Sequence, residues 1–166
     1  LALFDSLSDL IALQHFVDLH LLGKNDEDRF GVQAIVNEHG EVEGLSDKLL
    51  IGATDVALND LLTVVHHYHG LAIASHIDRE SFSVLGQLGF IDDSIHFDAL
   101  EISYATGIRQ ARERYADLKK YAFITSSDAH YLKDIGRATT KIMINEPTLS
   151  ELKMAFSREN GRYVVE

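Results

Sequence analysis

Two short apolar stretches decide the fold: LAIAS at residues 71–75, which leads into His76, and YAFITSS at residues 121–127, which leads into Asp128 and His130. Apolar runs of this length are typical of strands that are buried on both faces of a parallel sheet. Because ligands bind at the carboxyl ends of such strands, we expect these three polar side chains to meet at one edge. Imidazole and carboxylate groups bind metal ions, so the edge is a predicted metal site.

The segments around these strands alternate between short β-like runs and amphipathic helices. This alternation predicts right-handed crossovers, a mostly parallel sheet and an α/β fold. Further strands are expected at about residues 1–4, 98–103, 140–144 and 162–165. Helices are expected at about residues 6–22, 54–70, 81–88 and 108–119, with a last helix from residue 148.

Polar residues before the helical patterns predict where the helices begin. Thr54 or Asp55 is expected to cap the second helix. Thr148 and Glu151 have the spacing of a capping box for the last helix. In the first helix, the three- and four-residue spacing predicts that Leu10 faces inward.

A β-hairpin insertion is expected at about residues 31–45, where two β-like runs flank the turn sequence NEHG at residues 37–40. The hairpin interrupts the strand–helix alternation and is either a flap over a site or a decorative insertion. We find no repeat, linker or low-complexity tract. Residues 1–166 are therefore expected to form a single domain.

The composition of the 166-residue chain is acidic, with a formal net charge of −11. No basic stripe follows any expected helix, so we predict no stable nucleic-acid binding and no membrane binding. A small phosphorylated substrate or a nucleotide remains compatible, because bound metal ions reverse the local sign of the field.

The chain has no cysteine, so metal ligands must be imidazole, carboxylate or water. This donor set suits zinc, manganese or iron. The absence of cysteine also agrees with a cytoplasmic location. The chain opens on LALF rather than on methionine, which predicts that the sequence starts inside a domain.

Several polar residues beside the strands have two readings. Asp128 and His130 either bind metal or belong to an ordinary surface turn. Arg79 either clamps a phosphate with its planar guanidinium or pairs with Asp78 or Glu80. Glu101, inside an apolar strand, either supports a metal-binding histidine or faces solvent from an edge strand.

The motifs SHIDR (75–79), SFS (81–83), LGFI (88–91) and SDAHYL (127–132) resemble the PHP (polymerase and histidinol phosphatase) family of metal-dependent phosphoesterases. The resemblance implies that the chain is the C-terminal part of a distorted (β/α)7, TIM-like barrel. It also implies up to three metal ions in the intact protein. His76 matches the family's third motif, and Asp128 and His130 match its fourth.

The family's first motifs, an Asp-Leu-His-x-His run and a Thr-Asp-His run, are absent from this sequence. By this resemblance, His76, Asp128 and His130 each serve a different metal, and one protein ligand per metal is too few for tight binding. We therefore predict that this chain alone binds metal weakly and has little activity. The missing strands predict an exposed sheet edge and a possible homodimer.

The resemblance implies a portion of a metal-dependent phosphoesterase, in which metal-activated water attacks a phosphate ester and Arg79 orients the phosphate. Two alternatives remain open. One is a non-catalytic α/β binding or regulatory domain, and the other is a metal-dependent amidohydrolase.

Overall fold

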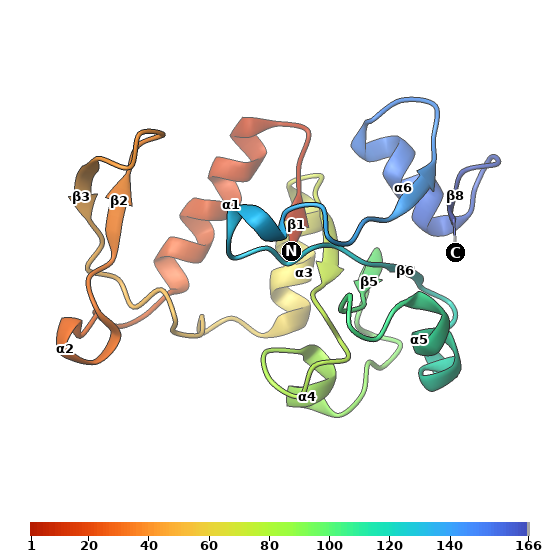
Figure 1. The fold of residues 1–166 in the computed structure, drawn as a ribbon, viewed down its shortest axis with the longest axis horizontal. Coiled ribbons are helices and arrows are strands. Elements are labelled where there is room, and N and C mark those ends of the chain that lie inside the picture. Colours follow the sequence, from red (N-terminus) through yellow and green to blue (C-terminus); the bar gives the residue numbers. More distant parts are fainter. Residues whose placement is uncertain (166) are drawn as a thin grey trace.

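The computed structural model describes residues 1–165, and its centre is a small mixed sheet of order β1-β4-β5-β6 (Figure 1). Strands β4 (Leu71–Ala74), β5 (Ala99–Glu101) and β6 (Ala122–Ile124) run parallel to one another. The predicted α/β fold with a parallel sheet is therefore confirmed. Strand β1 (Ala2–Leu3) runs antiparallel to β4, so the sheet is not parallel throughout.

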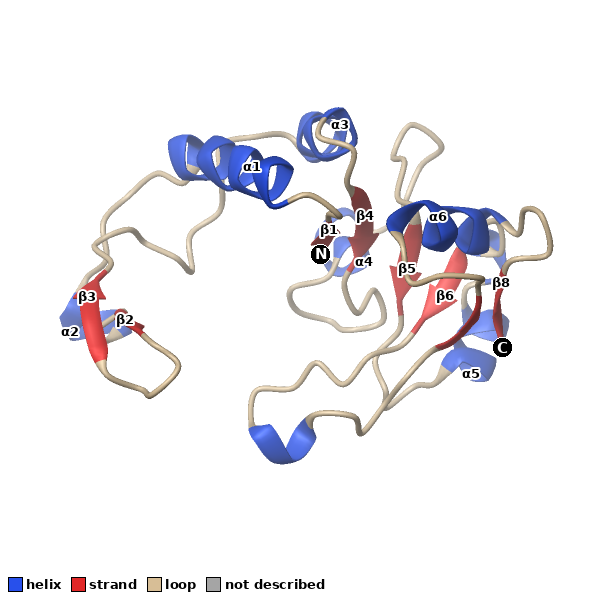
Figure 2. Ribbon diagram, turned by 90° about the horizontal axis from the view of Figure 1, so that it is seen from above, coloured by secondary structure: helices blue, strands red, loops and turns tan. Residues whose placement is uncertain are grey.

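Helices cover both faces of this sheet (Figures 1 and 2). On one face Ala72, Leu100 and Phe123 are buried in a core shared with α1 (Leu7–His20), α3 (Leu58–His67) and α5 (Ile108–Arg114). On the other face Leu71, Ile73, Ala99 and Ala122 are buried against α6 (Leu149–Ser157) and β8 (Tyr163–Val165). Burial on both faces explains why the strands read as unbroken apolar runs.

Two shorter helices complete this part of the fold. Helix α4 (Val84–Leu88) begins after Ser83, whose side chain accepts a hydrogen bond from the Gly86 amide. The helix expected at residues 108–119 is divided, because α5 ends at Arg114 and a 3₁₀ turn, η1, covers Ala116–Leu118.

The helix starts agree with the sequence only in part. Helix α3 begins after Ala57, which makes no side-chain cap, so the expected cap at Thr54 or Asp55 is wrong. The Asp55 carboxylate lies 2.7 Å from Nδ1 of His20 instead. Asp55 therefore contacts α1 instead of capping α3.

Two side chains that are far apart in the sequence, Thr148 and Asp5, cap the N-terminus of helix α6. Its Thr148 hydroxyl accepts from the Glu151 amide at 3.4 Å, while both carboxylate oxygens of Asp5 accept from the Leu149 amide at 3.1 and 3.2 Å. The Glu151 carboxylate does not complete the capping box, because it accepts from the Asn145 amide and from Arg162. The capping box is therefore half formed.

The last strands form a separate antiparallel pair, in which β7 (Lys141–Met143) pairs with β8. Between β6 and β7 lies a long loop that contains the 3₁₀ turn η2 (Leu132–Asp134).

The hairpin stands apart from the central sheet (Figure 2). Strands β2 (Ala34–Val36) and β3 (Val42–Leu45) pair only with each other, next to the short helix α2 (Glu27–Phe30). The hairpin itself is confirmed, and its origin as an insertion stays a prediction. None of the helices within residues 1–165 is long and apolar enough to span a membrane.

Candidate metal and phosphate site

The carboxyl ends of β4, β5 and β6 place three loops side by side. His76 follows β4, Ser103 follows β5, and Asp128 follows β6. Because adjacent parallel strands end at the same edge, loops more than twenty residues apart in sequence lie next to one another. We call this edge, formed by residues 75–79, 102–107 and 125–138, the strand-end rim.

Two of the predicted site residues meet at the strand-end rim. Nη2 of Arg79 lies 2.6 Å from Oδ2 of Asp128, and the side chains are 39% and 28% exposed. Arg79 therefore pairs with Asp128, not with Asp78 or Glu80. The contact holds a guanidinium and a predicted metal ligand at one point of the rim.

His76 and Asp128 both have strained backbones, with φ values of 26° and 45° in the left-handed region that favours glycine. Such strain is tolerated where the surrounding structure imposes it, and it is concentrated at functional sites. Nδ1 of His76 is buried and has no hydrogen-bond partner, and Oδ2 of Asp128 makes its ion pair without a hydrogen bond. A divalent cation would satisfy the Asp128 oxygen, and it would satisfy Nδ1 of His76 in the tautomer that carries its proton on Nε2.

His130 lies further out on the same loop and is exposed. Its Nδ1 is 3.0 Å from the carbonyl oxygen of Asp128, and because a carbonyl can only accept, Nδ1 must donate. In the neutral ring this leaves Nε2 as the acceptor. A backbone carbonyl that fixes the tautomer in this way is the usual support of a metal-binding histidine.

Glu101 joins the loops of His76 and Asp128 from the strand between them. Its side chain is buried, with 6% of the residue exposed. One carboxylate oxygen accepts from the His76 amide at 3.3 Å, and the other accepts from the Ser126 hydroxyl. Glu101 is therefore not on a solvent-facing edge strand. It supports the backbone of His76 rather than its imidazole ring.

Asp78 ties the middle loop to the first. Its carboxylate accepts hydrogen bonds from the Ser103 amide at 2.8 Å and from the hydroxyls of Ser103 and Thr106. Burial alone would raise the pKa of Asp78, but these hydrogen bonds outweigh it and hold the pKa below 3.8. The sequence places Asp78 near the site without revealing these partners, because Ser103 is twenty-five positions away.

The residues of the rim fit a divalent ion by chemistry, although they do not form a complete site. No group of three or more His, Asp or Glu side chains within residues 1–165 is arranged to hold a metal. The donors that are present, His76, Asp128 and His130, are imidazoles and a carboxylate, which suit zinc or manganese. Their metal-binding role stays a prediction.

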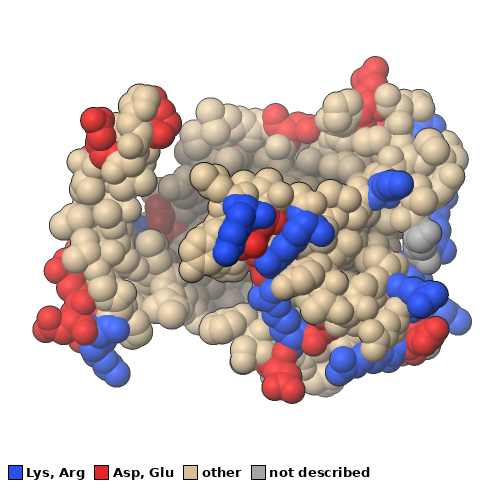
Figure 3. All heavy atoms as spheres, in the orientation of Figure 1, with Lys and Arg blue, Asp and Glu red and all other residues tan. Residues whose placement is uncertain are grey.

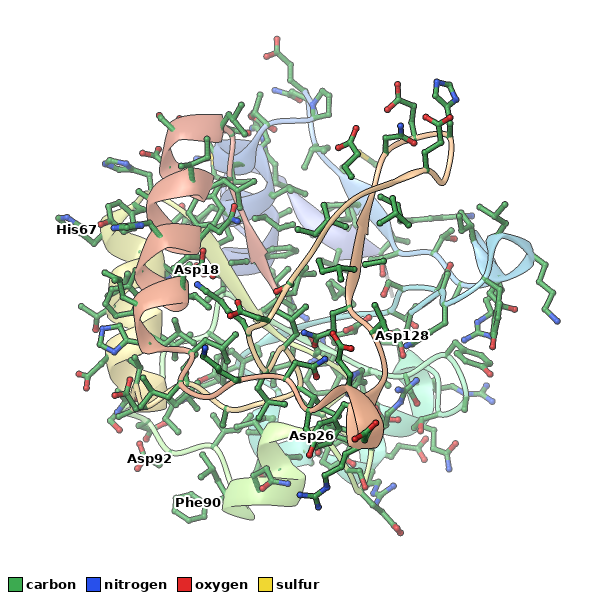
Figure 4. All side chains as sticks on the ribbon, turned by 90° about the vertical axis from the view of Figure 1, so that its left-hand side faces the viewer. Asp18, Asp26, His67, Phe90, Asp92 and Asp128 are labelled. Carbon is green, nitrogen blue, oxygen red and sulfur yellow. The ribbon has the colours of Figure 1, made fainter. Side chains whose placement is uncertain are left out.

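The histidines near the end of α3 belong to another part of the molecule. His67 lies on the opposite side from Asp128 (Figure 4). Nearby, Nε2 of His66 lies 2.9 Å from Oδ2 of Asp98, and the same oxygen accepts from the Ala72 amide. The sequence pattern predicts that Asp98 starts a strand. In the structure Asp98 is the last residue of the loop before β5.

Comparison with known proteins links the chain to one family and one fold. Residues 109–160 match the family model described as PHP-associated. The endonuclease Q of Pyrococcus furiosus, described as a novel lesion-specific endonuclease, has the same fold with a TM-score of 0.68 and 15% identity. An endonuclease Q complex with a 27-mer duplex substrate, which has an abasic lesion at the active site, gives a TM-score of 0.67 and 14% identity.

These structures are much longer than the present chain. The matches cover 98% of this chain but only 36% and 37% of the two endonuclease Q chains. No curated protein matches the sequence.

One prediction from composition is wrong. The acidic net charge and the lack of a basic stripe predict no stable nucleic-acid binding, yet a protein of the same fold is bound to duplex DNA. Net charge averages over the whole surface and does not report the field at one rim.

The remaining comparison supports the sequence motifs. The PHP-associated match spans α5 except for its first residue, and all of β6, β7 and α6, and it includes Asp128 and His130. Together with the shared fold, it supports the resemblance of the chain to the PHP domain family.

Proposed function

We propose that this chain is part of a metal-dependent hydrolase that cleaves phosphate esters at the strand-end rim. The observation that carries the proposal is the 2.6 Å contact between Arg79 and Asp128, at the rim that also carries the buried and unpartnered Nδ1 of His76. A cation for the phosphate and donor atoms for metal ions thus lie on the same rim. In this proposal His76, Asp128 and His130 hold metal.

Divalent ions, when bound, supply an activated water and neutralise charge on the phosphoryl group. The residues of the chain have supporting roles. Arg79 binds a phosphate oxygen through its guanidinium, and its contact with Asp128 orients it for this. The Asp128 carbonyl holds the His130 ring in one tautomer. Glu101 fixes the spacing between the loops of His76 and Asp128.

The substrate class is proposed from the fold relative. Endonuclease Q acts on DNA with a lesion, and that activity supports a nucleic-acid phosphodiester as the bond cleaved by the whole protein. In the same proposal, β4, β5 and β6 are three strands of a TIM-like (β/α)7 barrel. A cytoplasmic location stays a prediction.

A manganese titration followed by NMR tests the metal site directly. Paramagnetic Mn²⁺ broadens nearby amide signals even when it binds weakly, so the experiment suits a chain with an incomplete ligand set. We expect the signals of His76, Asp128 and His130 to broaden first. Asp128→Asn should weaken this broadening, whereas Asp117→Asn, at an exposed position of the turn η1, should leave it unchanged.

Two results would count against this function. Broadening that is spread over the acidic surface, with no preference for the rim, would favour a non-catalytic binding domain. In the whole protein, metal-dependent cleavage of amides without cleavage of phosphate esters would favour an amidohydrolase.

A further inference from the structure

Four side chains beside the site form a surface that the metal chemistry does not use. Tyr104 comes from the loop after β5, and Tyr131, Lys133 and Arg137 come from the loop after β6. We call these four residues the rim platform. Figure 3 shows Lys and Arg atoms gathered on the face toward the viewer, over the segment that contains η2, with acidic atoms between them.

The two tyrosines of the rim platform are unusually open to solvent. Tyr131 is 70% exposed and Tyr104 is 48% exposed. An exposed aromatic ring buries apolar surface when a second ring stacks on its face. Exposed rings beside a binding site are therefore suited to stacking. Tyr131 directly follows the predicted ligand His130, so its ring stands at the margin of the proposed metal site.

The cations of the rim platform are held next to these rings. Cζ of Arg137 lies 4.0 Å from the centroid of the Tyr104 ring, and its Nε donates to the Ser127 carbonyl at 3.0 Å. Nζ of Lys133 lies 5.7 Å from the centroid of the Tyr131 ring. Among the described residues Lys133 has no ion pair, so its charge is available to a ligand. Nη1 of Arg137 lies 3.4 Å from Oδ1 of Asp134 and shares its charge with that carboxylate.

The loops that present the rim platform are tied in place. The Ser127 hydroxyl accepts from the Gly136 amide at 2.8 Å and donates to the Ala138 carbonyl at 3.2 Å. Asp78 holds the turn before and after Tyr104 through Ser103 and Thr106. A preorganised surface loses less entropy on binding, so these ties favour ligand binding.

We propose that the rim platform binds a short single strand of nucleic acid, with bases stacked on Tyr104 and Tyr131 and phosphates against Lys133 and Arg137. Alternating aromatic and basic side chains are the usual means of binding single strands without reading their sequence. The proposal rests on the proposed function and names the partner of the same site. The formal net charge of −11 sums over the whole chain, whereas the rim platform sets the local field that a few nucleotides would meet.

Fluorescence anisotropy with a labelled oligothymidylate of roughly ten nucleotides tests the proposal at low salt. EDTA is present throughout, so that metal binding plays no part. Tyr131→Ala should weaken binding by about tenfold, because one stacked base is lost. Tyr131→Phe should retain nearly full affinity, since the phenyl ring still stacks. Tyr163→Ala, on β8, is the matched control for an exposed tyrosine.

The lysine is tested by salt dependence. Lys133→Ala should reduce the slope of log affinity against log salt by about 0.7, the value for one phosphate contact with a single strand. Lys153→Ala on α6 removes the same charge elsewhere and should leave the slope unchanged.

The outcomes separate this proposal from the proposed function. Equal affinity of the wild type, Tyr131→Ala and Lys133→Ala would overturn the rim platform, even if Mn²⁺ still broadens the His76 and Asp128 signals. Conversely, platform-dependent binding in EDTA with no manganese effect at the rim would support the platform and refute the hydrolase.

Discussion

The central sheet and the hairpin are built from similar residues, yet they differ in burial. Strands β4 and β5 are buried at every position, whereas all three residues of β2 are exposed. Ile35 and Val36 are no less apolar than Ile73, but nothing within residues 1–165 covers them as α3 and α6 cover the sheet. Apolar composition therefore predicts a strand, and only a second layer gives that strand a core.

Helix α1 shows the same contrast within one element. Its spacing predicts an inward stripe, and Leu13 is buried as expected. Leu10, predicted to face inward, is 44% exposed, and Leu7 and Leu19 are also exposed. Periodicity identifies the apolar side of a helix but does not reveal whether another element packs on it.

The largest expected effect comes from the core of the sheet. Phe123 is fully buried on β6, so Phe123→Ala should lower the free energy of unfolding by about 3–5 kcal/mol through lost burial and a cavity. Urea denaturation measures the change. A loss below 1 kcal/mol would show that the sheet is no better packed than the hairpin, and the comparison would fail.

The second effect concerns the rim, where the packed sheet meets the site. Glu101→Ala leaves the His76 amide and the Ser126 hydroxyl without their partner and should cost about 2 kcal/mol. The exchange rate of the His76 amide should rise with it. Glu101→Gln keeps an acceptor for the amide and serves as the control. If both variants exchange alike, the carboxylate does not position this loop.

The third effect is a pH-dependent change in stability, and it concerns the ion pair between Glu151 and Arg162. The bidentate contact with Arg162, at 2.9 Å to each oxygen, and the Asn145 amide hold the pKa of Glu151 below 4.5. A depressed carboxyl pKa stabilises the fold above the unfolded value, and this stability is lost as the pH falls through the folded pKa. Glu151→Gln should therefore flatten the fall of the urea midpoint below pH 4.5. An unchanged acid profile would show that the pair contributes no pH dependence.

The smallest effect belongs to the hairpin. Ile35→Ala should change the unfolding free energy by about 0.5 kcal/mol or less, because the side chain is already 52% exposed. Amides of β2 and β3 should exchange much faster than those of β4 and β5. Slow amide exchange in the hairpin would mean that another part of the protein or a partner covers it in solution. The hairpin and the sheet would then differ less in burial.

Much of the fold follows from local sequence, because buried parallel strands need continuous apolar runs. The runs before His76 and Asp128 predict β4 and β6, and Gly40 in its turn predicts the hairpin. The antiparallel direction of β1 could not be predicted, since a two-residue strand carries no signal of direction.

The site was predictable residue by residue but not as an arrangement. Strand ends indicate His76 and Asp128, whereas the pairing of Arg79 with Asp128 spans forty-nine positions and has no local signature. The prediction of no stable nucleic-acid binding is wrong for a similar reason. Composition sums charges over the chain, and it cannot show that Lys133 and Arg137 gather beside exposed tyrosines.

The bond from the Leu149 amide to Asp5 has a consequence for how the chain acquires its fold. The two residues are 144 positions apart, so during synthesis Asp5 leaves the ribosome long before its partner exists. Until then the Asp5 carboxylate has no helix N-terminus to cap. Helix α6 can dock on the sheet only after residues 149–157 have emerged, and contacts of such long range slow folding.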